Sequence, residues 1–255
     1  MELFQDDPLF TAFAIIAVLL SGLSKGGFGG GVGFIGVLAL AQVSSPVTAV
    51  AIMLPILCVM DLIGVHAYRR HWHRHSLKVL GIGCMIGTLV GMIAFKWMDD
   101  QAIRLMVGFI AIAFFVDFFR SGGEKAVART FSDPIGYGLG TLAGFTSFVI
   151  HAGLPPVAMY LLPQRLDKRI HVGTIVILFF IINYAKILPY WWLGLFTPAN
   201  LTASLILIPL APIGMFIGLK LNHMISQKWF MRVSYSILFI LGLRLLYDGL
   251  LPFFN

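Results

Sequence analysis

The feature that most constrains this chain is a series of apolar runs, each about twenty residues long. A helix rises about 1.5 Å per residue, so a run of this length covers the roughly 30 Å of a bilayer's hydrocarbon core. Of the 255 residues, 59% are hydrophobic and 11% are charged, which lies far outside the range of soluble domains. Because a spanning segment must satisfy its own backbone hydrogen bonds, we expect an all-α polytopic membrane protein.

Eight segments result when the apolar runs are divided at charges, prolines and glycines. Six have the length of one span, whereas two are about 30 residues long, which is too long for one span and too short for two. The two long segments are 9–42 and 134–162, and the six ordinary spans are 46–67, 77–95, 103–119, 171–192, 199–219 and 231–250.

Both long segments are interrupted by residues that end helices. The first contains Lys25-Gly-Gly-Phe-Gly-Gly-Gly31, and the second contains His151-Ala-Gly-Leu-Pro-Pro156. We expect each to form a re-entrant hairpin of two half-helices. Unwound backbone at membrane depth is tolerated only where protein or a water-filled cavity surrounds it, so the hairpin tips should line a site.

The two halves of the chain align with each other. Residue pairs at one common offset include Ser24 and Thr146, Gly31 and Gly153, and Asp61 and Asn183. Matches that stay in register across a whole half indicate duplication. We therefore expect two membrane repeats, residues 1–125 and 126–255, each a hairpin followed by three transmembrane helices.

Loop charges indicate how the repeats are oriented. The loop from Tyr68 to Lys78 carries three arginines, one lysine and three histidines, and the loops at 120–133, 163–171 and 220–232 are also net basic. The positive-inside rule places these loops in the cytoplasm and both chain termini outside. Every loop obeys the rule if the two long segments return to their own side, which makes the repeats inverted.

Inverted repeats with broken helices place a substrate site where the hairpin tips meet. The second arm of each hairpin begins at its tip, so two helix N-termini point inward, each equivalent to about half a positive charge. Lys25 adds a full charge beside the first tip, so we expect a small anion as the ligand. The predicted substrate-binding residues are Ser24, Lys25, Gly26, Gly27, Gly29, Gly30, Thr146, Ser147, His151, Gly153, Asn183 and Lys186.

The charged candidates also have simpler interpretations. Lys25 could snorkel to an interface, and His151 could bond backbone carbonyls at its tip. Asp61 and Lys186 could form a structural ion pair near the pseudo-two-fold axis. Asp61 is also the candidate for proton coupling, because a carboxylate at membrane depth is costly and is usually paired or functional.

Several other functions are not expected. Gly31-Val-Gly-Phe-Ile-Gly36 matches the dinucleotide fingerprint literally, yet it lies in a membrane segment with no preceding strand. His71-Trp-His-Arg-His75 has neighbouring arginines that oppose a metal cation, and the basic residues lie in membrane loops rather than in a nucleic-acid surface. We find no paired nucleophile and base, so we expect no catalytic residue, no cofactor, no metal and no nucleic-acid partner.

The chain resembles the TauE/SafE family of sulfite and organosulfonate transporters over nearly its whole length. The resemblance lies in the glycine-rich hairpin Gly22-Leu-Ser-Lys-Gly-Gly-Phe-Gly-Gly-Gly31, in the second hairpin with Gly153 and Pro155, and in the pair Asn183 and Lys186. Members of this family are bacterial inner-membrane proteins that carry sulfite, sulfoacetate and related anions, commonly outward. The resemblance implies a similar cargo and the same membrane here, with both termini in the periplasm.

The sequence thus predicts a secondary transporter that exports a small sulfur-containing anion by alternating access. The expected partners are the anion and the lipid bilayer, and a homodimer is left open. With no ATP-binding motif, gradients must supply the driving force. An anion channel and a carrier of another small anion are the main alternatives, and an intramembrane enzyme is a more distant one.

Overall fold

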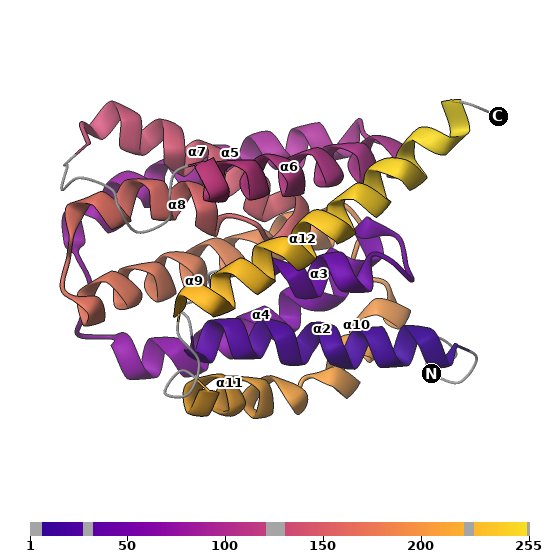
Figure 1. Ribbon diagram of the computed structural model, residues 1–255, viewed down its shortest axis with the longest axis horizontal. Coiled ribbons are helices and arrows are strands. Elements are labelled where there is room, and N and C mark those ends of the chain that lie inside the picture. The colour runs from indigo at the N-terminus through magenta and orange to yellow at the C-terminus, as the bar shows by residue number, and fades with distance from the viewer. Residues whose placement is uncertain (1–6, 28–32, 121–130, 222–226, 254–255) are drawn as a thin grey trace.

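The structure is a computed structural model that describes residues 7–27, 33–120, 131–221 and 227–253. Its regular elements in these ranges are helices, most of which run along one long axis (Figure 1). The first half contains α2 (Pro8–Gly27), α3 (Phe34–Leu40), α4 (Pro46–Tyr68), α5 (Arg74–Lys96) and α6 (Asp100–Arg120). The second half contains α7 (Asp133–Ile150), α8 (Leu154–Leu161), η1 (Leu162–Gln164), α9 (Lys168–Trp192), α10 (Pro198–Leu207), α11 (Leu210–Leu221), α12 (Gln227–Leu250) and η2 (Leu251–Phe253).

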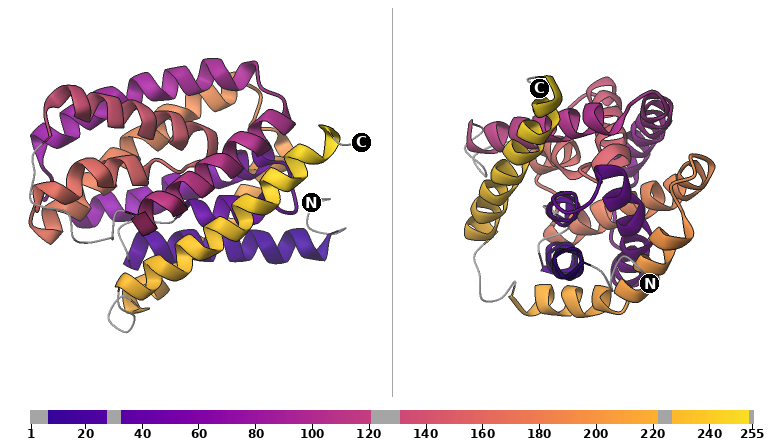
Figure 2. Two further views of the ribbon diagram at one scale, coloured as in Figure 1. Left: turned by 45° about the horizontal axis from the view of Figure 1, so that its top comes forward. Right: turned by 90° about the vertical axis from the view of Figure 1, so that its right-hand side faces the viewer.

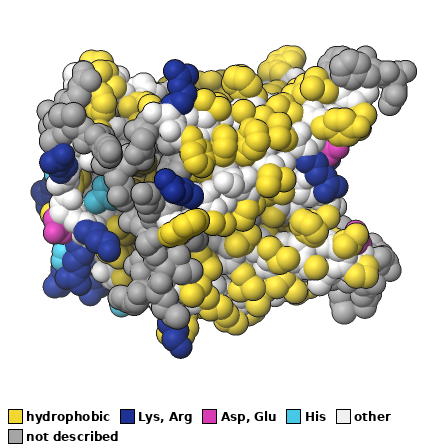
Figure 3. All heavy atoms as spheres, viewed as in Figure 1, with side chains coloured by type: hydrophobic (Ala, Val, Ile, Leu, Met, Phe, Trp, Pro, Cys, Tyr) yellow, Lys and Arg dark blue, Asp and Glu magenta, His cyan; other side chains and the backbone are white. Residues whose placement is uncertain are grey.

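Four helices are long and apolar enough to cross a membrane, namely α2, α4, α5 and α9. A fifth candidate is the pair α10 and α11, which are bent by 44° relative to each other. Proline at 209 removes a backbone donor at this bend, so the predicted span 199–219 is a broken helix rather than a straight one. On the face that Figure 3 shows, apolar side chains cover the region between the two ends of the bundle, and the described residues form an all-helical, multi-pass membrane protein.

The two segments expected to be hairpins have arms of unequal length. In the first, α2 has 20 residues and α3 has seven; in the second, α7 has 18 and α8 has eight. The prediction of two half-helices does not fit α2, which is both long and apolar enough to cross a membrane, whereas α7 is not among the candidate spans. Helix α2 ends at Gly27, within the glycine-rich sequence, and α7 ends at Ile150, directly before the His-Ala-Gly sequence.

Hydrogen bonds between loops define the two ends of the bundle. At one end, the His73 N–H donates to Thr174 Oγ1 at 2.9 Å, and Ser76 Oγ donates to Gln164 Oε1 at 2.9 Å. This end, formed by the loop 68–76 and the starts of α7 and α9, is called the basic end. Lysine, arginine and histidine side chains gather there, at the left of Figure 3.

The other end is called the opposite end. There Gln101 Nε2 donates to Gly249 O at 3.1 Å, and the Arg104 guanidinium lies 3.5 Å from Ser44 O. Helix α2 begins and α12 ends on this side (Figure 1). The basic loop thus lies across the bundle from the beginning of the first described helix and from the end of the last long one.

Helices of the two halves pack against one another in pairs. Helix α2 contacts α11, α5 contacts α7, α4 contacts α9, and α6 contacts α12. Figure 2 shows α12 lying obliquely across the outside of the bundle, beside α6. Each of these pairs joins one helix from the first half with one from the second, so the two halves are packed together along their lengths.

Glycines form the contact between α2 and α11. A Cβ added at Gly22 or Gly26 would meet the backbone of α11 at Gly214 and Met215, and one added at Gly218 would meet Leu23. Glycines four residues apart on both helices let the backbones approach closely, as in other transmembrane helix pairs. The contact of α5 with α7 is built the same way, from Gly83, Gly87, Gly140 and Gly144.

Candidate functional site

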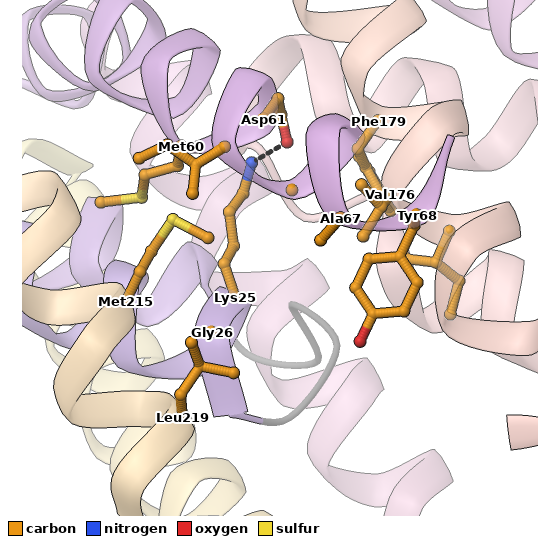
Figure 4. Close-up of a pocket in the computed structure, with 13 residues that line it drawn as sticks. Lys25, Gly26, Met60, Asp61, Ala67, Tyr68, Val176, Phe179, Met215 and Leu219 are labelled. Atoms are coloured by element: carbon orange, nitrogen blue, oxygen red, sulfur yellow. Dashed lines mark hydrogen bonds and ion pairs between the residues drawn. The ribbon is translucent and has the colours of Figure 1, made fainter. Parts of the chain in front are cut away.

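The first polar cluster joins α2, α4 and α9. Near the end of α2, the Lys25 ammonium forms an ion pair with the Asp61 carboxylate of α4 (Figure 4) and lies 3.4 Å from Leu57 O. From α9, Asn183 Nδ2 donates to the second carboxylate oxygen of Asp61 at 2.6 Å. Asp61 is 3% exposed, so its charge is buried, but both of its oxygens have a partner.

The second polar cluster lies where α7 ends beside α9. Lys186 Nζ donates to Ser147 O at 2.9 Å, to Ser147 Oγ at 3.1 Å and to His151 Nδ1 at 2.7 Å. These three acceptors match the three hydrogens of an ammonium group. Lys186 is completely buried, and its partners here are all neutral. The cluster therefore compensates Lys186 by hydrogen bonds rather than by a carboxylate.

His151 fixes the tip of the second hairpin. Its backbone has φ 57°, in the left-handed region, where the chain turns out of α7. Its Nε2 lies 3.1 Å from Val50 O, and a carbonyl can only accept, so the ring carries its proton on Nε2 and presents Nδ1 to Lys186 as an acceptor. A side chain at this φ costs about 1–2 kcal/mol, which the two ring hydrogen bonds offset.

A cavity of about 100 Å³ lies beside the first cluster. Lys25 and Asp61 form its polar floor, and its described walls come from α2, α4, α9 and α11. The apolar side chains of the wall are Met60, Ile63, Ala67, Ile175, Val176, Phe179, Met215 and Leu219. Tyr68 stands at the end of α4 that belongs to the basic end, so the cavity extends from the Lys25–Asp61 pair toward that end (Figure 4).

Comparison with known proteins decides the family. The profile described as "Sulfite exporter TauE/SafE" matches residues 13–245, which is nearly the whole chain. The chain belongs to the TauE/SafE family. No curated protein and no solved structure matches in the other two comparisons. The resemblance stated from the hairpin sequences is therefore confirmed, and the protein is a member of a family of membrane transporters.

The predicted site residues of this TauE/SafE protein divide between the two clusters. Lys25, Asp61 and Asn183 meet in the first, and Ser147, His151 and Lys186 meet in the second. Of these six, only Lys25 and Asp61 line the cavity described above. The interpretation of Lys25 as a snorkelling residue does not fit its ion pair, and Asp61 is paired with Lys25 rather than with Lys186.

The remaining candidates have mainly structural contacts. Thr146 Oγ1 donates to Ala152 O at 2.9 Å within the second hairpin, and Ser24 is fully buried. A Cβ at Gly27 or Gly153 would meet neighbouring helix atoms, so these glycines allow close packing. Gly26 packs against α11 and also lines the cavity. Two further candidates, Gly29 and Gly30, lie outside the described residues.

Helix N-termini are less prominent in the site than expected. Helix α3 begins after Gly33 and α8 begins after Gly153, neither with a side-chain cap. Among the residues that the structure describes, the cavity wall contains none from α3 or α8. An attraction of the two dipoles for an anion therefore stays a prediction, and the described cavity owes its positive charge to Lys25.

Sequence reasoning missed one residue that lines the cavity. Gly64 lines it, one turn along α4 from Asp61. The offset that pairs Asp61 with Asn183 also pairs Gly64 with Lys186, and it pairs Lys25 with Ser147. Each half thus has one lysine linking its hairpin to the following long helix, but the lysine stands on the hairpin in the first half and on the long helix in the second. This exchange could have been read from the aligned repeats.

Proposed function

We propose that the protein is a secondary transporter that exports a small sulfur-containing anion by alternating access. The observation that carries the proposal is the charge at the centre of the bundle. Lys25 and Lys186 provide two ammonium groups, and among the described residues one carboxylate, that of Asp61, pairs with Lys25 while Lys186 has neutral partners. Excess positive charge at membrane depth is costly, and an anion bound beside it would compensate it.

The cavity favours an organosulfonate over sulfite. Its polar floor accepts one charged group, whereas its walls are apolar side chains from four helices. Sulfite consists of the oxyanion group alone, so it has no apolar part to place against these walls, and burying oxygens there without partners costs free energy. An organosulfonate with an alkyl end, such as ethanesulfonate, can place that end against the wall while its sulfonate group faces Lys25. Sulfoacetate would need a second polar partner for its carboxylate. The sulfite named in the family's description is the second candidate.

An alternating mechanism requires two halves that can exchange roles. The pairing of helices supports inverted repeats at 1–125 and 126–255, because the hairpin helix of each half packs on a span of the other through glycines: α2 on α11, and α7 on α5. The pairs α4 with α9 and α6 with α12 then lie across the pseudo-two-fold axis. In the arrangement seen, the Lys25 side has a cavity that extends to the basic end, while Lys186 is sealed.

The basic end is assigned to the cytoplasm by the positive-inside rule, which makes this arrangement inward-facing. The membrane is then a bacterial inner membrane with both termini periplasmic, as the family resemblance implies. A homodimer stays a prediction. The second candidate function, an anion channel, would need a path continuous to the opposite end, and the buried Lys186 cluster lies across that route.

Binding to purified protein tests the proposal. Methanesulfonate, ethanesulfonate, sulfoacetate, sulfite, sulfate and sodium are titrated against wild type and Lys25→Met. Loss of a hydrogen bond to a charged group costs about 1.5–3 kcal/mol, so Lys25→Met should weaken sulfonate binding about 10- to 100-fold. The matched control is Lys96→Met, which removes an exposed lysine from the last turn of α5. Equal losses in both variants, or tight binding of cations alone, would show that the site is not at Lys25.

A further inference from the structure

We infer that the anion and one proton bind together, with Asp61 as the proton site. The inference rests on the proposed function and concerns the same cavity. Lys25 is the group that an anion would contact, yet its ammonium is already paired with Asp61. An incoming anion therefore competes with a carboxylate that is fixed in the floor of the site.

The burial of Asp61 favours the existing ion pair over the incoming anion. Asp61 is 3% exposed even though it lines the cavity together with Lys25. If the anion drew Lys25 away, a buried carboxylate would be left with Asn183 as its remaining described partner. Such an uncompensated charge is strongly unfavourable. A proton on Asp61 removes the charge and releases Lys25 to the anion.

Asn183 suits both protonation states of Asp61. Its Nδ2 now donates to the carboxylate at 2.6 Å. Rotating the amide by half a turn would present Oδ1 instead, which can accept a hydrogen bond from a protonated carboxyl group. A lysine or arginine at this position has donors alone and would hold Asp61 in its charged form. Asn183 occupies the position of the second half that corresponds to Asp61 in the first.

The other titratable groups near Asp61 do not replace it. The groups that lie within electrostatic range are Lys25 on α2, Cys58 on α4, and Tyr184 and Lys186 on α9. Thiols and phenols ordinarily release their protons above about pH 8, so Cys58 and Tyr184 stay neutral at lower pH. Lys186 donates to three acceptors as an ammonium group and has no place for a further proton, and a proton added to His151 Nδ1 would face that ammonium, 2.7 Å away.

A consequence concerns the driving force. An empty site holds two ammonium groups and one carboxylate, and a site with a monoanion and a protonated Asp61 has the same net charge. Binding of the anion and the proton then leaves the net charge of the site unchanged, so the membrane potential does not act on the transport cycle. The anion gradient and the pH difference would set the direction of transport.

The test uses ethanesulfonate, which stays a monoanion between pH 6 and 8, so any proton taken up comes to the protein. Calorimetry in buffers of different ionisation enthalpy should show uptake of close to one proton per anion by wild type. Its Kd should rise about tenfold per pH unit, as linkage of one proton requires. Asp61→Asn should bind the anion with a Kd that does not change with pH. His151→Asn should keep the pH dependence of wild type.

The outcomes separate this inference from the function on which it depends. Binding by wild type that is independent of pH, with no proton uptake, would overturn the proton site and leave the anion site standing. A pH dependence that disappears in His151→Asn and persists in Asp61→Asn would also overturn it. Failure of wild type to bind any anion would instead defeat the proposed function. The wild-type calorimetry needs no variant, so poor folding of Asp61→Asn would not leave the question open.

Discussion

Replacing Asp61 by asparagine tests how the buried Lys25–Asp61 pair affects stability. The substitution keeps the shape of the side chain but removes its charge, and the Lys25 side chain is 15% exposed. Breaking one side of a buried ion pair costs about 3–5 kcal/mol, because the remaining charge is uncompensated. Lys25 borders a cavity, so we expect the lower value. About 3 kcal/mol corresponds to a fall in Tm of roughly 6–12 °C for a chain of this size.

The double variant Lys25→Met with Asp61→Asn supplies the decisive comparison. It removes both charges and fills the space of the lysine stem with an unbranched apolar side chain. Replacing both members of a buried ion pair by groups of similar volume is often neutral or stabilising. We therefore expect the double variant to unfold within about 3 °C of wild type, well above Asp61→Asn alone.

The chain supplies its own reporters for the measurement. Cys58 and Cys84 are free and buried, so a thiol-reactive fluorophore becomes bright as the protein unfolds in detergent. Cys58 lies on α4 close to Asp61, so all variants are prepared with Cys58→Ala, which leaves Cys84 as the reporter. The reasoning would be refuted if Asp61→Asn melted with wild type, or if the double variant melted as low as the single one.

Three further predictions concern packing and orientation. Gly87→Val places carbon against the backbone of α7, so Tm should fall by several degrees, whereas Gly138→Ala, whose Cβ would meet nothing, should leave it unchanged; equal effects would contradict the close-packing account. His151→Gly should be about 1 kcal/mol more stable than His151→Ala, since glycine adopts a φ of 57° without strain; the reverse order in thermal melts would count against it. Ala67→Cys at the cavity wall should react with an impermeant thiol reagent from the cytoplasmic face, more slowly with sulfonate present; labelling from the periplasm would reverse the assigned orientation.

The helical membrane class and the family could be derived from sequence, because both depend on local patterns. Apolar runs of span length require helices, and the hairpin sequence around Lys25 carries the family resemblance. The lengths of the hairpin arms and the bend between α10 and α11 could not be derived from the sequence in the same way. Their arms are unequal because the helix of α2 continues until the glycines that follow Lys25, and the bend between α10 and α11 depends on a proline inside an apolar run.

The candidate site was identified as a set of residues but not as an arrangement. The sequence placed Lys25, Asp61, Asn183 and Lys186 at membrane depth, and all four are described in polar contacts. It treated Gly26 and its neighbours as ligand contacts, and Gly26 both lines the cavity and packs against α11. Glycine has no side chain, which allows both close ligand contact and close helix packing, so composition alone does not distinguish the two roles.

The sequence by itself determined that this chain is a helical membrane protein of the TauE/SafE family with charges and glycines at its centre. The tertiary structure decided which charges compensate each other. The sequence left a structural Asp61–Lys186 pair open as an alternative, whereas in the structure Asp61 is paired with Lys25, and Lys186 with Ser147 and His151. Such pairing depends on which helices lie side by side, and here the glycine contact between α2 and α11 places α2 where Lys25 can reach α4. That contact joins residues far apart in the chain, which local patterns do not specify.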